Sequence, residues 1–285
     1  MTGLFRSLIF VPGNNPRFLE KSKLIEADIV CFDLEDSVPD SEKKTARSLI
    51  RNALKDRAKY KSEVYVRINS PQSGKVKDDL EQVIQKGLDG VVIPKVDSSK
   101  DLNKITKILT SLEKKRKIKR LPLMPSIESA QGAVNAYQIA SSNKRVSALV
   151  FGVFDLLNDM GIEYTKQAPG AQYAREKVPV DATAAGVYAI DAIWQDLKDG
   201  DGLKEDCARG KSLGYVGKSI IHPSQIPIAH EIFAPNQSEI DWAQKVCDAY
   251  SQSVTRGKGA TVVEGRMIDE VHYKRARSLL EVANK

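Results

Sequence analysis

The sequence has few of the features expected of secreted or membrane-spanning proteins. Its three cysteines, Cys31, Cys207 and Cys247, are far apart and odd in number, which favours neither a disulfide framework nor a zinc site. No apolar run reaches the 18 residues of a membrane span. Residues 1–13 hold a short apolar stretch after Arg6, without the longer core and cleavage site of a signal peptide. We therefore expect a reduced, cytoplasmic protein with no membrane partner.

The composition is that of an ordinary globular protein. Of its 285 residues, 41% are hydrophobic and 28% charged, which allows one large domain or one domain with an appendage. The formal charge is +7, and the densest basic run is "EKKRKIKR" at 113–120. This run ends a helical pattern and has no interleaved aromatic residues, so a solvated helix face is favoured over a nucleic-acid surface. Alternatively, part of the positive charge serves an anionic small molecule.

Hydrophobic periodicity predicts eight strands that alternate with helices. The strand-like runs are 7–11, 29–34, 64–69, 90–96, 121–127, 148–153, 187–193 and 219–221. Regular alternation implies parallel strands joined by helical crossovers. We predict an α/β protein with a (β/α)8 (TIM) barrel at 1–233 and a C-terminal helical lid extension at 234–285. A doubly wound open sheet is the alternative, and the absence of G-x-G-x-x-G after the first strand weakens it.

Polar side chains gather where the predicted strands end. In a barrel, these ends surround one face, and catalysis takes place there. The residues concerned are Arg67, Asn69, Lys95, Glu128, Asp155, Asp191 and His222. The stretch "IVCFDLEDSVPDSEKKTAR" adds Asp33, Glu35, Asp36 and Asp40 after the second strand. Carboxylates collected at the end of a buried strand repel one another, so they need arginines, waters or a metal as partners.

Glu128 and Asp155 are candidate metal ligands. Each follows an apolar strand, and the two strands are neighbours in a barrel. Carboxylates without cysteine or histidine nearby suit Mg2+. The alternative is that both acids only cap the helices that follow them. Arg67 also needs an anionic partner, either a substrate carboxylate or one of the acids Glu35 and Asp36.

Beyond these residues, the chain resembles the citrate lyase β-subunit-like group of the HpcH/HpaI aldolase superfamily, which includes malyl-CoA and citramalyl-CoA lyases. The resemblance rests on "RSLIFVPGNNP", "DLEDSVP", "VRIN", "DGVVIPKV", "IESAQG", "FGVFDL", "YAIDAI", "GKSIIHPSQI" and "IFAPNQSEIDWA", in this order. It covers nearly the whole chain. It implies a (β/α)8 barrel, Mg2+ with Mn2+ as a substitute, and chemistry at a carbon–carbon bond next to an acyl thioester.

The resemblance also implies roles for individual residues. Glu128 and Asp155 match the metal ligands, and Arg67 matches the arginine that holds the keto acid. Glu35 and Asp36 match acids that bind metal-bound waters and Arg67, and so orient both. The positions that match the CoA pocket are Phe10, Arg17, Lys21, Ser219 and Ile220.

The tail "GKGATVVEGRMIDEVHYKRA" resembles the Gly-rich loop and "MID" segment of stand-alone lyases. The resemblance implies that Asp269 is an acid/base that enters the site of a neighbouring subunit in a homotrimer or dimer of trimers. From the residues alone, Asp269 is an ordinary acid at a helix entry. The tail also argues against a citrate lyase β subunit, because such subunits are expected to be shorter and to use an acyl carrier protein.

These observations predict a Mg2+-dependent carbon–carbon lyase. Its substrate would be malyl-CoA, citramalyl-CoA or citryl-CoA, and its products acetyl-CoA and a keto acid, or the reverse. Thioester hydrolysis would add a malate-synthase-like activity. The alternatives are a CoA-independent metal-dependent aldolase and a citrate lyase β subunit. The sequence does not distinguish glyoxylate, pyruvate and oxaloacetate, because one methyl group changes selectivity by only about 10–200-fold.

Overall fold

The computed structural model describes residues 5–283 of the chain. These residues form two compact units, Phe5–Ala229 and the chain from His230 onward. The division at residue 233 inferred from the sequence stays a prediction. None of the helices in the described chain has the length and apolar character needed to cross a membrane.

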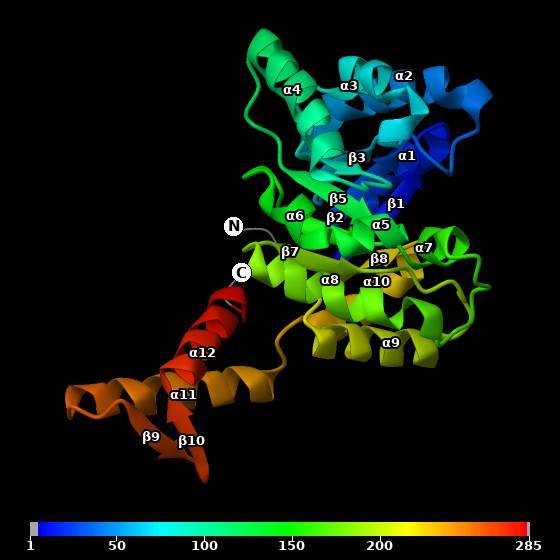
Figure 1. The fold of residues 1–285 in the computed structure, drawn as a ribbon. Coiled ribbons are helices and arrows are strands. Elements are labelled where there is room, and N and C mark those ends of the chain that lie inside the picture. Colours follow the sequence, from blue (N-terminus) through cyan, green and yellow to red (C-terminus); the bar gives the residue numbers. More distant parts are fainter. Residues whose placement is uncertain (1–4, 284–285) are drawn as a thin grey trace. The chain divides into compact units, whose positions relative to one another are not determined.

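The first unit is a closed barrel of eight parallel strands in the order β1 to β8 (Figure 1). The strands are β1 (Ser7–Pro12), β2 (Ile29–Asp33), β3 (Glu63–Arg67), β4 (Gly90–Ile93), β5 (Leu123–Ile127), β6 (Ala148–Phe151), β7 (Tyr188–Asp191) and β8 (Gly217–Ile220). Pairing of Ser7 with Lys218 joins β1 to β8 and closes the ring. The predicted (β/α)8 barrel is confirmed.

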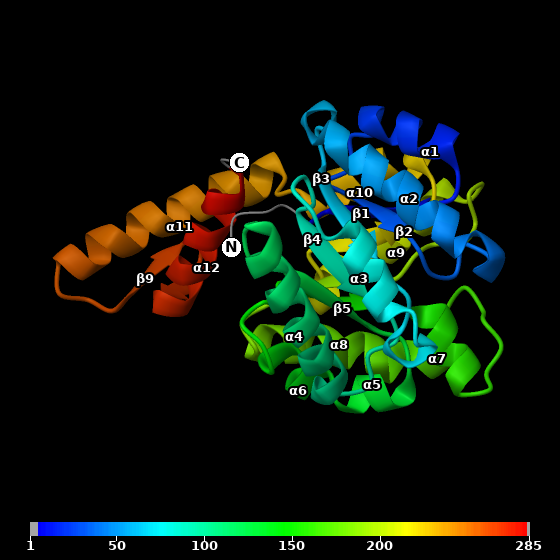
Figure 2. The ribbon, with the colours of Figure 1, turned by 90° about the horizontal axis from the view of Figure 1, so that it is seen from above.

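Helices cover the outside of the barrel, as Figures 1 and 2 show. They are α1 (Pro16–Lys21), α2 (Lys43–Ala53), α3 (Val76–Val83), α4 (Ser99–Arg116), α5 (Ala130–Val134), α6 (Ala136–Ser141), α7 (Val153–Asp159), α8 (Gln172–Ala184), α9 (Gly200–Leu213) and α10 (Ile226–Phe233). Side-chain caps fix several of their starts. Asn15 caps α1, Ser129 caps α5 and Asp199 caps α9.

Apolar side chains fill a central cluster in the barrel unit. Tyr65 on β3 is the largest of them, and Cys31, Val92 and Met124 lie in the same cluster. A Cβ on Gly90 would lie only 2.1 Å from Cε1 of Tyr65, so the ring requires glycine at this position of β4. Because side chains alternate along a strand, polar residues at the strand ends can reach the cavity above this cluster.

The second unit contains α11 (Gln237–Thr255), β9 (Ala260–Val263), β10 (Arg266–Asp269) and α12 (Glu270–Ala283). Asn236 and Glu239 form a capping box at the start of α11. β9 and β10 pair antiparallel across Glu264 and Gly265, which both have positive φ, as a two-residue hairpin turn requires. The tail is therefore helical, as expected, but the predicted Gly-rich loop includes a β-hairpin.

Candidate active site

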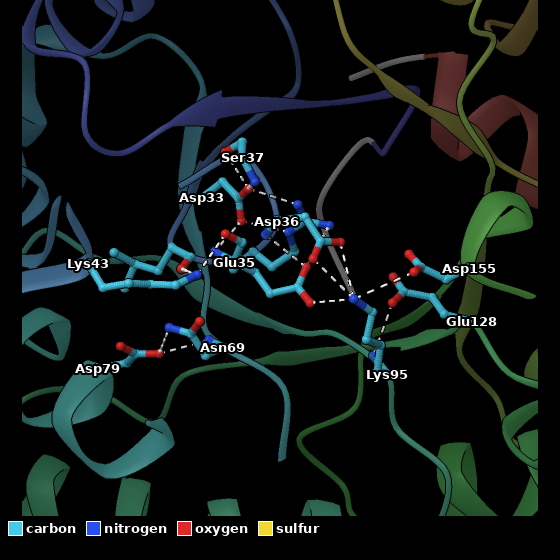
Figure 3. A network of polar contacts seen from close by, with 12 residues as sticks. Asp33, Glu35, Asp36, Ser37, Lys43, Asn69, Asp79, Lys95, Glu128 and Asp155 are labelled. Carbon is cyan, nitrogen blue, oxygen red and sulfur yellow. Dashed lines mark hydrogen bonds and ion pairs between the residues drawn. The ribbon is translucent and has the colours of Figure 1, made fainter. Parts of the chain in front are cut away.

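A cavity of about 510 Å³ opens where the barrel strands end, a size typical of small-molecule sites. Its lining includes these residues singled out from the sequence: Phe10, Asp33, Asp36, Arg67, Glu128, Asp155 and Ser219. Glu35 lies beside them, with its side chain 7% exposed. The structure thus brings together most of the predicted site, and Figure 3 shows its acidic part.

Arg67, the last residue of β3, is held by an acid that the sequence reasoning did not pair with it. Its Nε and Nη2 donate to the two carboxylate oxygens of Asp33 over 2.7 and 2.8 Å. Glu35 is a more distant partner, at 3.5 Å from Nη1. Asp33 and Arg67 occupy paired positions on β2 and β3. Burial alone would raise the pKa of Asp33. The charge and hydrogen bonds of Arg67 lower it by more, so the net result is a pKa of about 2.

Glu128, directly after β5, is a buried carboxylate with incomplete charge compensation. Burial raises its pKa to about 7, Glu35 and Asp155 add to the rise, and Arg67 opposes it. Its Oε2 accepts a hydrogen bond from the backbone N–H of Lys95 over 3.1 Å. A Cβ on Gly152 would lie 2.5 Å from Cγ of Glu128, so Gly152 makes room for the acid.

Glu128 does not cap the helix that follows it. Ser129 has that role in α5, since its hydroxyl accepts from the N–H of Gly132 over 2.9 Å. Asp155 lies in the first turn of α7, where the helix dipole favours a carboxylate, and its side chain is 39% exposed on the cavity wall. The capping alternative is therefore wrong for Glu128.

Lys95 holds the acidic residues together, and the sequence reasoning gave it no role. Its Nζ lies 2.8 Å from Oε1 of Glu35, 3.1 Å from Oδ1 of Asp36 and 3.5 Å from Oδ1 of Asp155 (Figure 3). Lys43 fixes the loop after β2, because its Nζ donates to the carbonyl oxygens of Leu34 and Glu35 over 2.8 Å. Burial raises the pKa of Glu35.

The donor set of this site fits a hard divalent cation. Glu128 and Asp155 offer carboxylate oxygens to the cavity, and burial, with smaller effects of Glu35 and Asp155, raises the pKa of Glu128 despite the nearby Arg67 and Lys95. In the described part of the chain, no group of three or more His, Cys, Asp or Glu side chains is arranged to hold a metal. Mg2+ needs only one or two carboxylates, because waters and substrate supply its other ligands.

Other predicted residues lie apart from this cluster. Arg17 and Lys21 are exposed on α1, four residues apart and hence on one face of the helix. Ile220 is only 1% exposed and does not line the cavity, whereas Ser219 and Ile221 do. This is the result of side-chain alternation along β8.

Three polar residues expected at the strand ends have structural partners instead. Asn69 donates to Asp79 over 2.7 Å. Asp191 is fully buried between Arg175 and Lys218. His222 accepts from the backbone N–H of Ser224.

Asp269 ends β10 in the second unit. Its Oδ1 accepts from the backbone N–H groups of Val271 and His272 over 3.0 and 3.3 Å, as an N-cap does. Nδ1 of His272 lies 2.7 Å from the same oxygen. The hydrogen bonds from His272 lower the pKa of Asp269. The acid/base role of Asp269 stays a prediction.

Comparison with known proteins identifies relatives that match almost the whole chain. The citrate lyase subunit beta of Leuconostoc mesenteroides subsp. cremoris is 33% identical over 99% of this chain and 94% of the relative. The (3S)-malyl-CoA thioesterase of Cereibacter sphaeroides is 33% identical over 98% of this chain and 94% of the relative. Among solved structures, the CitE protein of Mycobacterium tuberculosis with magnesium, acetoacetate and coenzyme A has a TM-score of 0.81 and 27% identity, with 100% and 99% of the two chains covered.

These relatives overturn one inference from the tail. We expected citrate lyase β subunits to be shorter than this chain, and took its tail as evidence against that role. The citrate lyase subunit beta of Escherichia coli K12 matches 98% of this chain, with 34% identity and 93% of its own length covered. The presence of the tail therefore does not separate stand-alone lyases from citrate lyase β subunits.

The family comparison agrees with the barrel and its cavity. Residues 6–223 match the profile of the HpcH/HpaI aldolase/citrate lyase family. This range contains all eight barrel strands and the cavity residues described above. The chain belongs to the HpcH/HpaI aldolase/citrate lyase family.

Proposed function

We propose that this protein is a Mg2+-dependent carbon–carbon lyase that cleaves a β-hydroxyacyl-CoA to acetyl-CoA and a keto acid, or catalyses the reverse condensation. The observation that carries the proposal is the cavity in which Arg67 and two oxygen-donor acids, Glu128 and Asp155, line one space. The names of the relatives support it, since they include a malyl-CoA thioesterase and a protein crystallised with magnesium and coenzyme A.

In this proposal Glu128 and Asp155 hold the metal ion. When bound, Mg2+ would supply positive charge that stabilises negative charge on the substrate hydroxyl oxygen, which loses its proton and becomes the keto oxygen of the product. Glu35 and Asp36 orient the waters around the ion, and Lys95 fixes both acids. Because Glu128 is buried and lies close against Gly152, its carboxylate is preorganised for this role.

Arg67 binds the carboxylate of the keto acid portion. Asp33 fixes the guanidinium plane through two hydrogen bonds, and the ring of Phe10 lies 4.5 Å from Cζ of Arg67. The guanidinium is therefore held in one orientation toward the cavity. A planar group of this kind can bind two carboxylate oxygens at once, which a lysine cannot do.

Asp269 is the proposed acid/base at the acetyl methyl carbon. In the cleavage direction, the substrate hydroxyl loses its proton to solvent, the carbon–carbon bond breaks, and Asp269 protonates the enolate carbon of acetyl-CoA. In the condensation direction, Asp269 removes that proton. The N-cap contacts of Oδ1 with Val271 and His272 fix the carboxylate, with Oδ2 as the reactive oxygen. We propose that Asp269 serves the barrel of a neighbouring subunit in a homotrimer or dimer of trimers, as a lid.

Arg17, Lys21, Phe10 and Ser219 are proposed to form the CoA site, whereas Ile220 is buried away from the cavity and is left out. The two exposed cations on α1 suit the CoA phosphates.

A second candidate function is that of a citrate lyase β subunit, which takes its acyl group from an acyl carrier protein thioester. The matches to citrate lyase β subunits along nearly the whole chain favour its inclusion.

A comparison of substrates tests the proposal. Purified protein is assayed with malyl-CoA, citramalyl-CoA and citryl-CoA, with citryl thioester on acyl carrier protein, and with the corresponding free hydroxy acids, each with Mg2+ and with EDTA. We expect cleavage of one CoA thioester that EDTA abolishes. Cleavage of the carrier-protein thioester alone would support the second candidate, and cleavage of free hydroxy acids alone would contradict both.

Replacement of Asp269 tests the acid/base role separately. Asp269→Asn keeps the shape of the side chain but cannot take a proton, so it should retain CoA binding and lose exchange of the acetyl methyl protons of acetyl-CoA with deuterium. Mixing Asp269→Asn with Glu128→Ala subunits should restore part of the activity if the tail serves a neighbouring barrel. Normal methyl exchange in Asp269→Asn would exclude Asp269 from the mechanism.

A further inference from the structure

Lys95 lies at the centre of the acidic side chains of the cavity (Figure 3). Its ammonium contacts Glu35, Asp36 and Asp155 at 2.8, 3.1 and 3.5 Å. Its backbone N–H donates to Glu128 over 3.1 Å. One residue therefore contacts four carboxylates, which come from the loop after β2, the end of β5 and the first turn of α7.

The backbone of Lys95 has the geometry that these contacts require. β4 ends at Ile93 and Pro94 follows. Lys95 then has a φ of 50°, in the left-handed region that side chains other than glycine rarely adopt. In this conformation its N–H faces Glu128 while its side chain reaches Glu35. A glycine at position 95 would adopt this φ without strain. The presence of a lysine there therefore indicates that its side chain has a function.

The charges near the cavity show which acids the ammonium of Lys95 stabilises. Arg67 is paired through two hydrogen bonds with Asp33. The negative charge of the remaining acids is then shared around the ammonium of Lys95. A divalent cation held by Glu128 and Asp155 would have to share Asp155 with this ammonium.

We infer that Lys95 is a resident counter-cation of the acidic site: its ammonium partly neutralises Glu35, Asp36 and Asp155 while the site is metal-free and competes with the divalent cation for Asp155. This inference rests on the proposed function, because it takes Glu128 and Asp155 as the metal ligands. It adds that the affinity for the metal is set by a residue that does not bind the metal. Lys95 is a positioning residue in this scheme.

Two other roles for Lys95 agree less well with the structure. A general base needs a neutral amine, but hydrogen bonds to Glu35 and Asp36 offset the effect of burial and raise the pKa of Lys95, so the side chain stays protonated. A surface ion pair would join one acid to one base. Lys95 instead joins acids from three separate segments, and its side chain is 31% exposed.

The test measures metal binding directly and does not depend on activity. Metal-stripped protein is titrated with Mn2+ by electron paramagnetic resonance and with Mg2+ by calorimetry. Lys95→Met removes the charge and keeps an unbranched side chain, so we expect it to lower the Kd for the metal at least about tenfold, because a like charge next to the ion is gone. Lys95→Arg, which keeps the charge, should stay within about threefold of wild type.

Lys75→Met is the matched control for net charge. Lys75 pairs with the exposed Asp40 over 2.6 Å, so its replacement removes one positive charge from a lysine that does not contact the four acids. Its metal Kd should stay that of wild type. In EDTA, Lys95→Met should melt below both wild type and Lys75→Met, and saturating Mg2+ should close that gap.

The outcomes separate this inference from the proposed function. If wild type binds the metal and Lys95→Met binds it equally or more weakly, Lys95 does not compete and the inference is wrong while the metal role stands. If wild type binds no metal, the proposed metal role fails and the inference fails with it. If Lys95→Met folds with Mg2+ but not in EDTA, the neutralising role is supported. If it folds neither with Mg2+ nor in EDTA, Lys95→Gln is titrated in its place against the same criteria.

Discussion

Replacing Glu128 with glutamine should change how the stability of the metal-free barrel depends on pH. Burial raises the pKa of Glu128 from 4.5 to about 7. At about 1.4 kcal/mol per pH unit, this difference corresponds to roughly 3 kcal/mol. The folded barrel binds this proton more tightly than the unfolded chain, so ionisation of Glu128 destabilises the fold. The penalty is absent below pH 4.5, grows as pH rises, and is complete above pH 7.

Glu128→Gln cannot ionise and so avoids this penalty. We expect the free energy of unfolding of Glu128→Gln, relative to wild type, to increase by roughly 3 kcal/mol between pH 4.5 and pH 8 in EDTA. The assay is urea unfolding followed by tryptophan fluorescence. Since the chain has two tryptophans, a Trp242→Phe background leaves Trp194, which lies in the barrel unit, as the reporter.

The comparison between pH values makes the result specific. Other acids, including Glu35, titrate in both proteins, and their effects largely cancel in the difference. Saturating Mg2+ at pH 8 should stabilise wild type more than the variant. A difference in stability that stays the same from pH 4.5 to pH 8 would show that Glu128 ionises without penalty, and would refute the incomplete charge compensation inferred above.

Two further substitutions test the geometry around these acids. Gly152→Ala would place a Cβ 2.5 Å from Cγ of Glu128, so we expect Mn2+ affinity and kcat/KM to fall at least about tenfold while the circular dichroism spectrum stays unchanged. Gly200→Ala, whose Cβ would meet only Cδ1 of Ile228 at an ordinary 3.8 Å, is the control. Arg67→Lys keeps the charge but loses the fork that Asp33 holds, so kcat/KM should fall at least about 100-fold; a variant that retains most of its kcat/KM would leave Arg67 with a structural role alone.

The barrel was predictable because apolar strands and amphipathic helices alternate over the whole first unit. The ends of the strands were less predictable. The run 90–96 reads as one strand, but β4 ends at Ile93, since Pro94 lacks an N–H group and Lys95 adopts a positive φ. Tertiary contacts with Glu128 and Glu35 fix that conformation, and local sequence does not reveal them.

The site was predictable where it followed from strand order. Glu128 and Asp155 follow neighbouring strands, so a barrel necessarily brings them near each other. The pairing of Arg67 with Asp33 depends in addition on register, since these residues lie opposite each other on β2 and β3. Periodicity locates a strand to within a few residues, whereas register must be known to one residue before the correct acid can be chosen among Asp33, Glu35 and Asp36.

The position of Lys95 also explains why this chain tolerates so many acids in one place. Asp33 is satisfied by Arg67, and Glu35, Asp36 and Asp155 share the ammonium of Lys95. Glu128 accepts a hydrogen bond from the backbone N–H of Lys95, and burial raises its pKa to about 7. The protein's own cations therefore do not offset the effect of burial on Glu128. In the proposed function, a divalent cation held by Glu128 and Asp155 would supply further positive charge and so favour the ionised form of Glu128.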